Sequence, residues 1–165
     1  MAAKPLADLS QFDFGTPLYN QEEIQNVNPQ RYEFSQLTAV VHVDESLQLA
    51  VGYKDISEEE FWVRGHMPGN PLMPGVIQCE CVAQLGGFYA CKFDVVAGDY
   101  MGFGGMKNVR FRKPILPGCR LDLVCQITQV RTRKLVYFDC QGFVKGEMAF
   151  EGTMIGVSIS SMTSD

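Results

Sequence analysis

Apolar residues recur along the chain with two different periods, which separates expected strands from an expected helix. An alternation of apolar with polar or small residues predicts one strand at Leu47, Leu49, Val51 and Tyr53. Residues 32–43 end in a valine-rich stretch and predict a long strand before it. Asp44, Glu45 and Ser46 supply a turn between the two. We therefore expect these strands to form a hairpin.

The most continuous apolar segment runs from Pro74 to about Phe93 and is predicted to be a long helix. Proline is well suited to the first turn of a helix, where its missing N–H costs nothing. Because the segment is apolar nearly all round, the helix should be buried. Gly86 and Gly87 in its interior each cost about 1 kcal/mol relative to alanine. We expect close backbone packing against a sheet or a partner to compensate.

The order of elements predicts the fold class. Two short helices are expected, one over residues 21–27 and one capped by Ser57 ahead of three glutamates. Four further strands are expected near residues 100–113, 119–132, 135–144 and 148–160. This pattern predicts an α+β domain over residues 21–165, with one long helix wrapped by an antiparallel sheet of about six strands. Residues 1–20 show little periodicity and are expected to be a loosely packed or disordered extension.

Composition narrows the class of protein. The chain has 165 residues, is 46% hydrophobic and carries a formal net charge of −5, so it is long enough for a sizeable core. An acidic balance gives no bulk attraction to nucleic acid or to an anionic membrane. No apolar run reaches the roughly 18 residues of a membrane span, and the N-terminus lacks the apolar region of a secretory signal. We expect a cytoplasmic protein that binds neither nucleic acid nor membrane.

The six cysteines do not suggest a metal site. None belongs to a C-x-x-C pair, and the chain has only two histidines, so a zinc site is not expected. Cys79 and Cys81 are two residues apart on the expected helix and therefore point in different directions. Reduced, buried cysteines are typical of a cytosolic protein.

The candidate chemistry lies in residues 66–84. His66 stands in a loop rich in proline and glycine, which can hold a single shape. Glu80 is a lone carboxylate in the apolar helix that follows. A fixed base, a fixed acid and the free N–H groups of a helix start suit proton abstraction next to a carbonyl. The plain alternatives are a loop histidine held by backbone hydrogen bonds and a carboxylate that reaches solvent; a buried Glu80 would indicate function or pairing.

This segment resembles the FabZ-type (3R)-hydroxyacyl-acyl-carrier-protein dehydratases. The family pattern H-F-P-G-x-P-x-x-P-G-V-x-x-x-E-x-x-A-Q matches at every fixed position except Met67, where the family usually has phenylalanine. A second stretch, residues 110–118, matches R-F-K/R-x-P-x-x-P-G. The resemblance covers roughly residues 22–160. It implies a hotdog fold, an obligate dimer and dehydration of a β-hydroxyacyl thioester without a cofactor or metal.

The resemblance also implies roles for matching residues. His66 is the expected base, Glu80 the expected acid or water-holding group, and the N–H groups at Gly75 and Val76 the expected donors to the thioester oxygen. Gln84, four residues after Glu80, is placed to orient it. Pro68, Gly69 and Pro74 are expected to support the loop and the helix start. Since Glu80 lies about 140° round the helix from Gly75, it should point away from its own Gly75. This fits the family arrangement, in which His66 of one subunit faces Glu80 of the other.

Partners and alternatives follow from the same resemblance. The expected partner is an acyl carrier protein that presents its substrate on a phosphopantetheine arm, and the expected assembly is a homodimer with shared active sites, with a trimer of dimers as a larger alternative. Arg110, Arg112 and Lys113 are a candidate docking patch for that acidic carrier, the alternative being ordinary solvated charges. A thioesterase on the same fold and a non-catalytic protein that binds acyl thioesters remain the alternative functions. Departures from the family pattern at Cys119 and Lys107 suggest a pathway other than bulk fatty acid synthesis.

Overall fold

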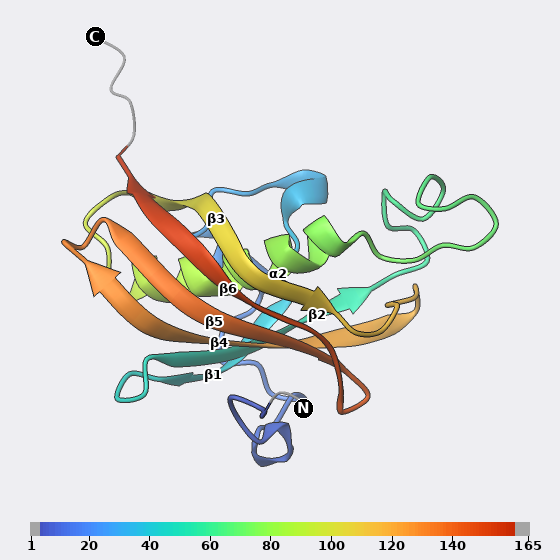
Figure 1. The fold of residues 1–165 in the computed structure, drawn as a ribbon, viewed down its shortest axis with the longest axis horizontal. Coiled ribbons are helices and arrows are strands. Elements are labelled where there is room, and N and C mark those ends of the chain that lie inside the picture. Colours follow the sequence, from blue (N-terminus) through green and yellow to red (C-terminus); the bar gives the residue numbers. More distant parts are fainter. Residues whose placement is uncertain (1–3, 161–165) are drawn as a thin grey trace, which may run out of the picture.

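The computed structural model describes residues 4–160, which form one antiparallel sheet around one long helix (Figure 1). The strands are β1 (Ala39–Asp44), β2 (Leu49–Ile56), β3 (Tyr100–Phe111), β4 (Cys119–Arg131), β5 (Leu135–Val144) and β6 (Glu147–Ile159). The long helix is α2 (Gly75–Lys92). Three short helices precede it: η1 (Leu9–Gln11), α1 (Gln21–Gln25) and η2 (Tyr32–Phe34). No helix within residues 4–160 is long and apolar enough to cross a membrane.

The sheet has the strand order β1-β2-β4-β5-β6-β3, and each neighbouring pair is antiparallel. The long strands β3 to β6 bend around α2, which lies along one face of the sheet (Figure 1). The α+β class, the six strands and the single long helix predicted from the hydrophobic periods are thus confirmed.

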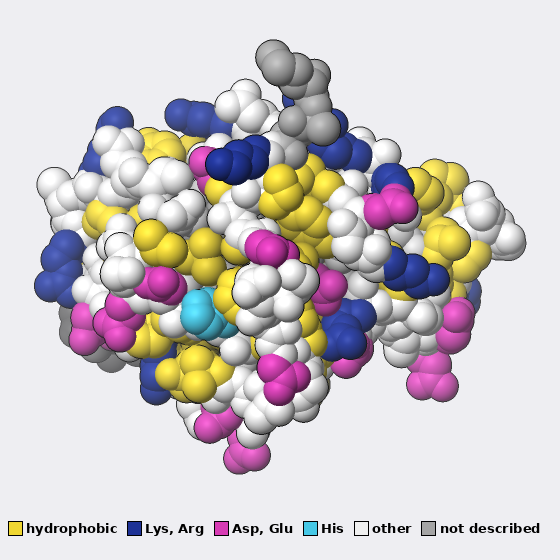
Figure 2. Space-filling model, turned by 90° about the horizontal axis from the view of Figure 1, so that it is seen from below, with side chains coloured by type: hydrophobic (Ala, Val, Ile, Leu, Met, Phe, Trp, Pro, Cys, Tyr) yellow, Lys and Arg dark blue, Asp and Glu magenta, His cyan; other side chains and the backbone are white. Residues whose placement is uncertain are grey.

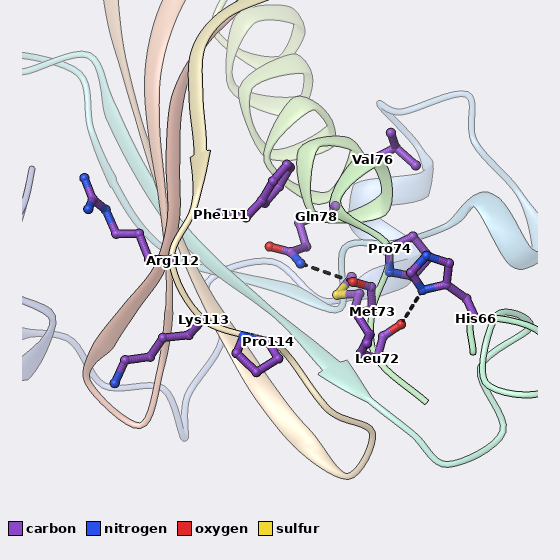
Figure 3. A pocket seen from close by; sticks show the side chains of 11 residues that line it. His66, Leu72, Met73, Pro74, Val76, Gln78, Phe111, Arg112, Lys113 and Pro114 are labelled. Atoms are coloured by element: carbon purple, nitrogen blue, oxygen red, sulfur yellow. Dashed lines mark hydrogen bonds between the residues drawn. The ribbon is translucent and has the colours of Figure 1, made fainter. Parts of the chain in front are cut away.

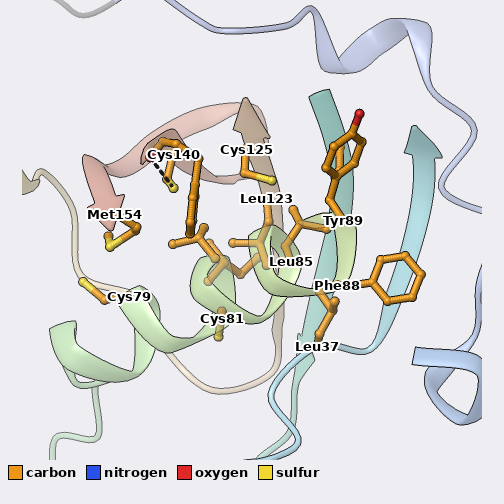
Figure 4. Close-up of a cluster of buried hydrophobic side chains, with 14 of the residues drawn as sticks. Leu37, Cys79, Cys81, Leu85, Phe88, Tyr89, Leu123, Cys125, Cys140 and Met154 are labelled. Atoms are coloured by element: carbon orange, nitrogen blue, oxygen red, sulfur yellow. Dashed lines mark hydrogen bonds between the residues drawn. The ribbon is translucent and has the colours of Figure 1, made fainter. Parts of the chain in front are cut away.

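The core lies between α2 and the sheet (Figure 4). Leu85 and Phe88 of the helix pack with Leu123 and Phe138 of the strands, and all four are almost completely buried. A Cβ added to Gly86 would lie 2.5 Å from the ring of Phe138. The conformational cost of glycine inside this helix is therefore offset by close contact with the sheet, as expected from the sequence.

Residues 6–14 of the N-terminal segment lie against the opposite face of the sheet. Leu6, Leu9 and Phe12 pack against a small buried cluster that includes Val51 and Val124. The segment is also held by its backbone, because the N–H of Leu6 donates to the side chain of Gln141 at 2.7 Å. From below, where this segment lies, apolar groups appear as separate patches among charged side chains (Figure 2). The expectation of disorder is therefore wrong for residues 4–20, whereas loose packing fits, since none of these residues is buried. Residues 1–3 lie outside the described part.

Two local predictions before α2 are also corrected. Residues 32–43 are not one strand: they begin with η2, and β1 starts only at Ala39. Ser57 does make a cap, since its Oγ accepts from the N–H of Glu59, but a series of turns follows and no helix forms. Leu47 lies in the turn before β2 and is exposed. A local cap or a local alternation thus does not fix where an element starts or how far it continues.

The two edges of the sheet differ. The outer edge of β1 is partly covered by the N-terminal segment, through a bridge between Tyr19 and Val40. At the other edge, β3 exposes the apolar side chains of Phe103, Met106 and Phe111. An edge strand with exposed apolar groups is a surface on which another chain can pair.

Candidate active site

Backbone contacts hold His66 on both sides of the chain. Its N–H donates to the carbonyl of Trp62 at 2.7 Å, and its own carbonyl accepts from the N–H of Leu72 at 2.9 Å. The imidazole Nδ1 lies 2.8 Å from the carbonyl oxygen of Leu72 (Figure 3). Because a carbonyl oxygen only accepts, Nδ1 carries the proton of this bond. In the neutral ring, Nε2 is then the unprotonated nitrogen that can act as a base.

The turn ahead of His66 is anchored in the core. Trp62, whose carbonyl holds His66, is itself buried. The turn is tied to β2 by an ion pair of 2.9 Å between Lys54 Nζ and Glu60 Oε1, in which both side chains are largely buried. Sequence reasoning gave no role to these residues, since the contact joins a strand to a turn.

The other end of the loop leads into α2. Gly69 has a φ of +77°, a conformation that glycine adopts without a steric penalty. Pro74 is the N-cap residue of α2. The N–H groups of Ile77 and Gln78 donate to the carbonyl of Pro74, whereas those of Gly75 and Val76 precede the first intrahelical bond. The helix therefore presents free N–H donors and the positive end of its dipole beside the His66 loop.

His66 and the start of α2 share one cavity of about 580 Å³ (Figure 3). This volume lies within the range typical of small-molecule sites. Besides His66, its lining includes Leu72, Gly75, Val76 and Gln78 on one side and residues 111–114 on the other. The structure thus brings together the expected base and the expected oxyanion donors.

Phe111 changes the explanation for Gly75. A Cβ added to Gly75 would lie 2.6 Å from the ring of Phe111, so this ring occupies the space that a side chain would need. A contact within the chain therefore already requires glycine at position 75. Phe111 and Gln78 were both missed from the sequence. Gln78 could have been found from the sequence, because it lies three residues after Gly75 and therefore on the same face of the helix.

Glu80 is held by a network of buried amides. Gln84, which is 3% exposed, donates from Nε2 to Glu80 Oε1 at 2.7 Å, as the spacing of four residues predicts. The same amide nitrogen also donates to the carbonyl of Phe34, and Gln84 Oε1 accepts from the N–H of Gln36 at 2.8 Å. The side chain of Asn28 bonds to the carbonyl of Gln84. These contacts fix the orientation of Gln84, and through it one oxygen of the partly buried Glu80.

Within one chain, Glu80 and His66 line different cavities. The cavity beside Glu80 has a volume of about 30 Å³ and lies between α2 and the edge formed by β3 and β6. None of the residues that line it also lines the His66 cavity. The two expected catalytic groups of one chain are therefore not presented to a common space.

The three basic residues of the candidate docking patch line two different cavities. Arg112 and Lys113 line the His66 cavity, and each forms an ion pair with a glutamate of β6, Glu151 and Glu147 respectively. Arg110 instead lines a separate cavity on the face where the N-terminal segment lies. Of the three expected docking residues, only Arg112 and Lys113 thus line the same cavity as His66.

All six cysteines are free, and those in the core have unreactive thiols. Burial raises the pKa of Cys79 to about 11 and that of Cys125 to about 12. Burial also raises the pKa of Cys81 and of Cys140. Since the thiolate is the nucleophile, these residues are packing groups and not reaction partners.

Solved structures share the whole architecture. The dehydratase heterocomplex ApeI:P from Xenorhabdus doucetiae aligns with a TM-score of 0.69 at 14% identity, covering 84% of this chain and 91% of that one. Cj0977, a sigma28-regulated virulence protein from Campylobacter jejuni, aligns with a TM-score of 0.62 at 18% identity, covering 84% and 97%. At such low identity these likenesses show the fold alone. They confirm the hotdog fold for this chain.

Curated relatives are closer in sequence. The 3-hydroxyacyl-(acyl-carrier-protein) dehydratase FabZ of Clostridium botulinum (strain Eklund 17B / Type B) is 39% identical over 111 residues, which cover 67% of this chain and 78% of the relative. The bifunctional enzyme LpxC/FabZ of Chlorobaculum tepidum is 34% identical over 141 residues, 84% of this chain but only 29% of that protein. The chain thus spans less than a third of the bifunctional relative.

Fold and site together define a hotdog-fold protein of the dehydratase class, with a histidine at the start of the central helix and a carboxylate within it. A family model described as a FabA-like domain matches residues 28–153. The chain belongs to this family and, by its curated relatives, to the FabZ-type dehydratases.

Proposed function

We propose that this chain is a hydro-lyase that dehydrates (3R)-hydroxyacyl thioesters of an acyl carrier protein to trans-2-enoyl thioesters, in fatty acid or related acyl-chain biosynthesis. The observation that carries the proposal is the bond from His66 Nδ1 to the carbonyl of Leu72, which leaves Nε2 as a base in a cavity at the start of α2. The FabZ relatives, which are 3-hydroxyacyl-(acyl-carrier-protein) dehydratases, support the choice of substrate.

Each step of the reaction has a group to perform it. Nε2 of His66 takes the proton from C2 of the substrate, a general-base role that an unprotonated imidazole nitrogen can fill. The negative charge that develops on the thioester oxygen is stabilised by the N–H groups of Gly75 and Val76 and by the helix dipole. The carboxyl group of Glu80 protonates or holds the departing 3-hydroxyl group. No cofactor is required, because the reaction only moves a proton and releases water.

A complete site requires two chains in this proposal. His66 and Glu80 of one chain line separate cavities, and β3 exposes an apolar edge next to the small cavity of Glu80. Pairing through β3 would cover this edge in a homodimer of two-fold symmetry. Each active site would then combine His66 of one chain with Glu80 of the other. An acyl carrier protein would deliver the substrate to the entrance beside Arg112 and Lys113.

An ultraviolet assay tests the reaction directly. The purified chain is incubated with a short 3-hydroxyacyl thioester of an acyl carrier protein, and formation of the conjugated enoyl thioester is followed by its absorbance. A thiol reagent in a parallel reaction measures release of free carrier thiol. Enoyl product without free thiol supports the proposal. Free thiol without enoyl product would show a thioesterase, and binding without either product would show a non-catalytic protein.

A further inference from the structure

The small cavity beside Glu80 is bounded on several sides by side chains of the same chain. Glu80 and Ala83 of α2 form one wall, and the other walls are formed by residues of three strands and one loop: Gln30, Met101, Gly102, Phe103, Phe138, Ile155 and Gly156. Its volume of about 30 Å³ holds little more than a group the size of a water molecule.

Met101 fills the slot that would otherwise extend this cavity. Its sulfur would lie 2.2 Å from a Cβ added to Gly156 on β6, and its Cε would lie 3.5 Å from a Cβ added to Gly87 on α2. The methionine side chain therefore occupies the gap between helix and sheet at a point where both carry glycine. Without it, Gly87 and Gly156 would face each other across a passage that begins at Glu80.

Among the large side chains that line this cavity, Met101 is the one whose replacement would change the cavity volume most directly. Phe138 is buried and lies in close contact with Gly86, so it cannot move toward the helix. Phe103 is 46% exposed and lies at the rim. Met101 is only partly buried and is unbranched, so its replacement changes the volume of the slot while the surrounding core keeps its contacts.

We propose that Met101 determines acyl-chain length in this protein and restricts it to short-chain 3-hydroxyacyl thioesters. The inference rests on the proposed function, in which Glu80 meets the hydroxyl group on C3. The carbon chain beyond C3 then begins at Glu80 and must enter the space that Met101 closes. A 3-hydroxybutyryl group places a single methyl there, which the cavity admits, whereas a 3-hydroxydecanoyl group would require the slot occupied by Met101.

Turnover of two chain lengths tests the proposal. The value of kcat/KM is measured for 3-hydroxybutyryl and 3-hydroxydecanoyl thioesters of pantetheine, with the wild type and with Met101→Ala. The wild type should favour the four-carbon substrate by at least about 10-fold, the scale of discrimination by an apolar pocket. Met101→Ala should raise the ratio of decanoyl to butyryl turnover by at least about 10-fold.

Three further variants control for general effects. Met101→Leu keeps the volume of the side chain and should keep the wild-type preference. Met101→Val leaves a smaller void than alanine, suits a strand, and should give an intermediate shift if Met101→Ala folds poorly. Met148→Ala removes a partly buried methionine from the opposite face of the sheet and should leave the preference unchanged.

Affinity measurements with saturated thioesters test the role of Met101 independently of catalysis. Affinities of saturated butyryl and decanoyl pantetheine thioesters, measured by calorimetry, should show the same wild-type preference and the same shift in Met101→Ala. Equal wild-type use of the two chain lengths, or an unchanged ratio in a folded Met101→Ala or Met101→Val variant, would overturn the role of Met101. Absence of enoyl product from both substrates would overturn the proposed function, and the binding ratio would then decide the role of Met101 by itself.

Discussion

Gln84 donates a hydrogen bond of 2.7 Å to the carboxylate of Glu80 from one turn further along the same helix. The amide that makes this bond is held by the backbone of Phe34 and Gln36, which lie far away in sequence. Glu80 is thus oriented by a side chain that the segment before β1 fixes in place. This relationship links the precision of the proposed site to a part of the fold that does not contact the His66 cavity.

Replacement of Gln84 by leucine should lower kcat by about 10- to 100-fold, because displacing a reacting group by about 1 Å has effects of this size. Stability should fall as well, by about 1–3 kcal/mol, because the buried N–H of Gln36 loses its partner. Asn28→Ala is the matched control: it removes a buried bond to the backbone of Gln84 and leaves the contact to Glu80 intact. It should lower the thermal midpoint with a much smaller loss of kcat. Equal losses of kcat in both variants would mean that Gln84 acts only through stability.

The acid and the base should each be indispensable. We expect His66→Ala and Glu80→Gln to reduce turnover in the ultraviolet assay by at least about 100-fold, the usual scale for general acid–base groups. Circular dichroism should show that both variants keep the fold, because neither side chain belongs to the buried core. Near-normal turnover by either variant would remove that residue from the mechanism.

Mixed chains should recover activity if each site is shared. His66→Ala and Glu80→Gln proteins are inactive alone in this scheme, but a heterodimer of the two contains one site with an intact His66 and an intact Glu80. Activity should therefore rise when the two are mixed under conditions that allow exchange of subunits. Exchange is monitored with chains that carry different affinity tags. Verified exchange with baseline activity would show that both residues act within one chain.

Carrier docking should depend on Arg112 and Lys113. The double variant Arg112→Gln, Lys113→Gln should raise KM for a carrier-bound substrate and leave KM for the same acyl group on pantetheine unchanged. The difference should shrink as salt is added, because exposed charges are screened over about 8 Å at physiological ionic strength. The matched control is Arg131→Gln, Lys134→Gln, two exposed basic residues at the end of β4 and the turn that follows. A similar rise in KM for both substrates would indicate that Arg112 and Lys113 support the cavity and its ion pairs with Glu151 and Glu147.

Asp122 should weaken the fold at neutral pH. Burial raises the pKa of this carboxyl group, an effect that the nearby Arg120 only partly opposes. The folded chain therefore binds this proton more tightly than the unfolded chain, and stability falls as pH rises from the ordinary value of 3.8 through the raised pKa. Asp122→Asn should raise Tm above this window and have little effect below it; a gain of about 1 kcal/mol corresponds to roughly 2–4 °C in a chain of this size.

Asp44→Asn should change Tm at neutral pH in the opposite direction to Asp122→Asn. Hydrogen bonds from Ser46 and Leu47 lower the pKa of Asp44, so its carboxylate form favours the folded state. Its replacement should reduce Tm at neutral pH, and the loss should disappear as pH falls through the lowered pKa. Thermal melts of both variants between about pH 3 and pH 8, the range in which carboxyl groups titrate, would check the two signs together. A lower Tm for Asp122→Asn at neutral pH would contradict the assignment of burial as the dominant cause.

The sequence by itself determined the elements whose signals are local. The long helix over 75–92 follows from a proline at its start and an apolar surface on all sides, and the strands after it follow from alternation over ten or more residues. The motif around His66 and Glu80 and the spacing to Gln84 are also local, so the sequence alone identifies these residues as candidates for the site. The N-terminal segment has no comparable periodicity in its sequence. Its placement depends on contacts of residues 6–14 with the outer face of the sheet.

Only the tertiary structure decided how these groups meet. The protonated nitrogen of His66 is fixed by the carbonyl of Leu72, and the placement of Glu80 and His66 in separate cavities depends on the path of the chain around α2. Met101 meets Gly87 and Gly156 only because β3 folds back beside β6. Sequence patterns report the period of an element and the chemistry of its side chains. Contacts between distant segments depend on packing in three dimensions, which the local pattern does not encode.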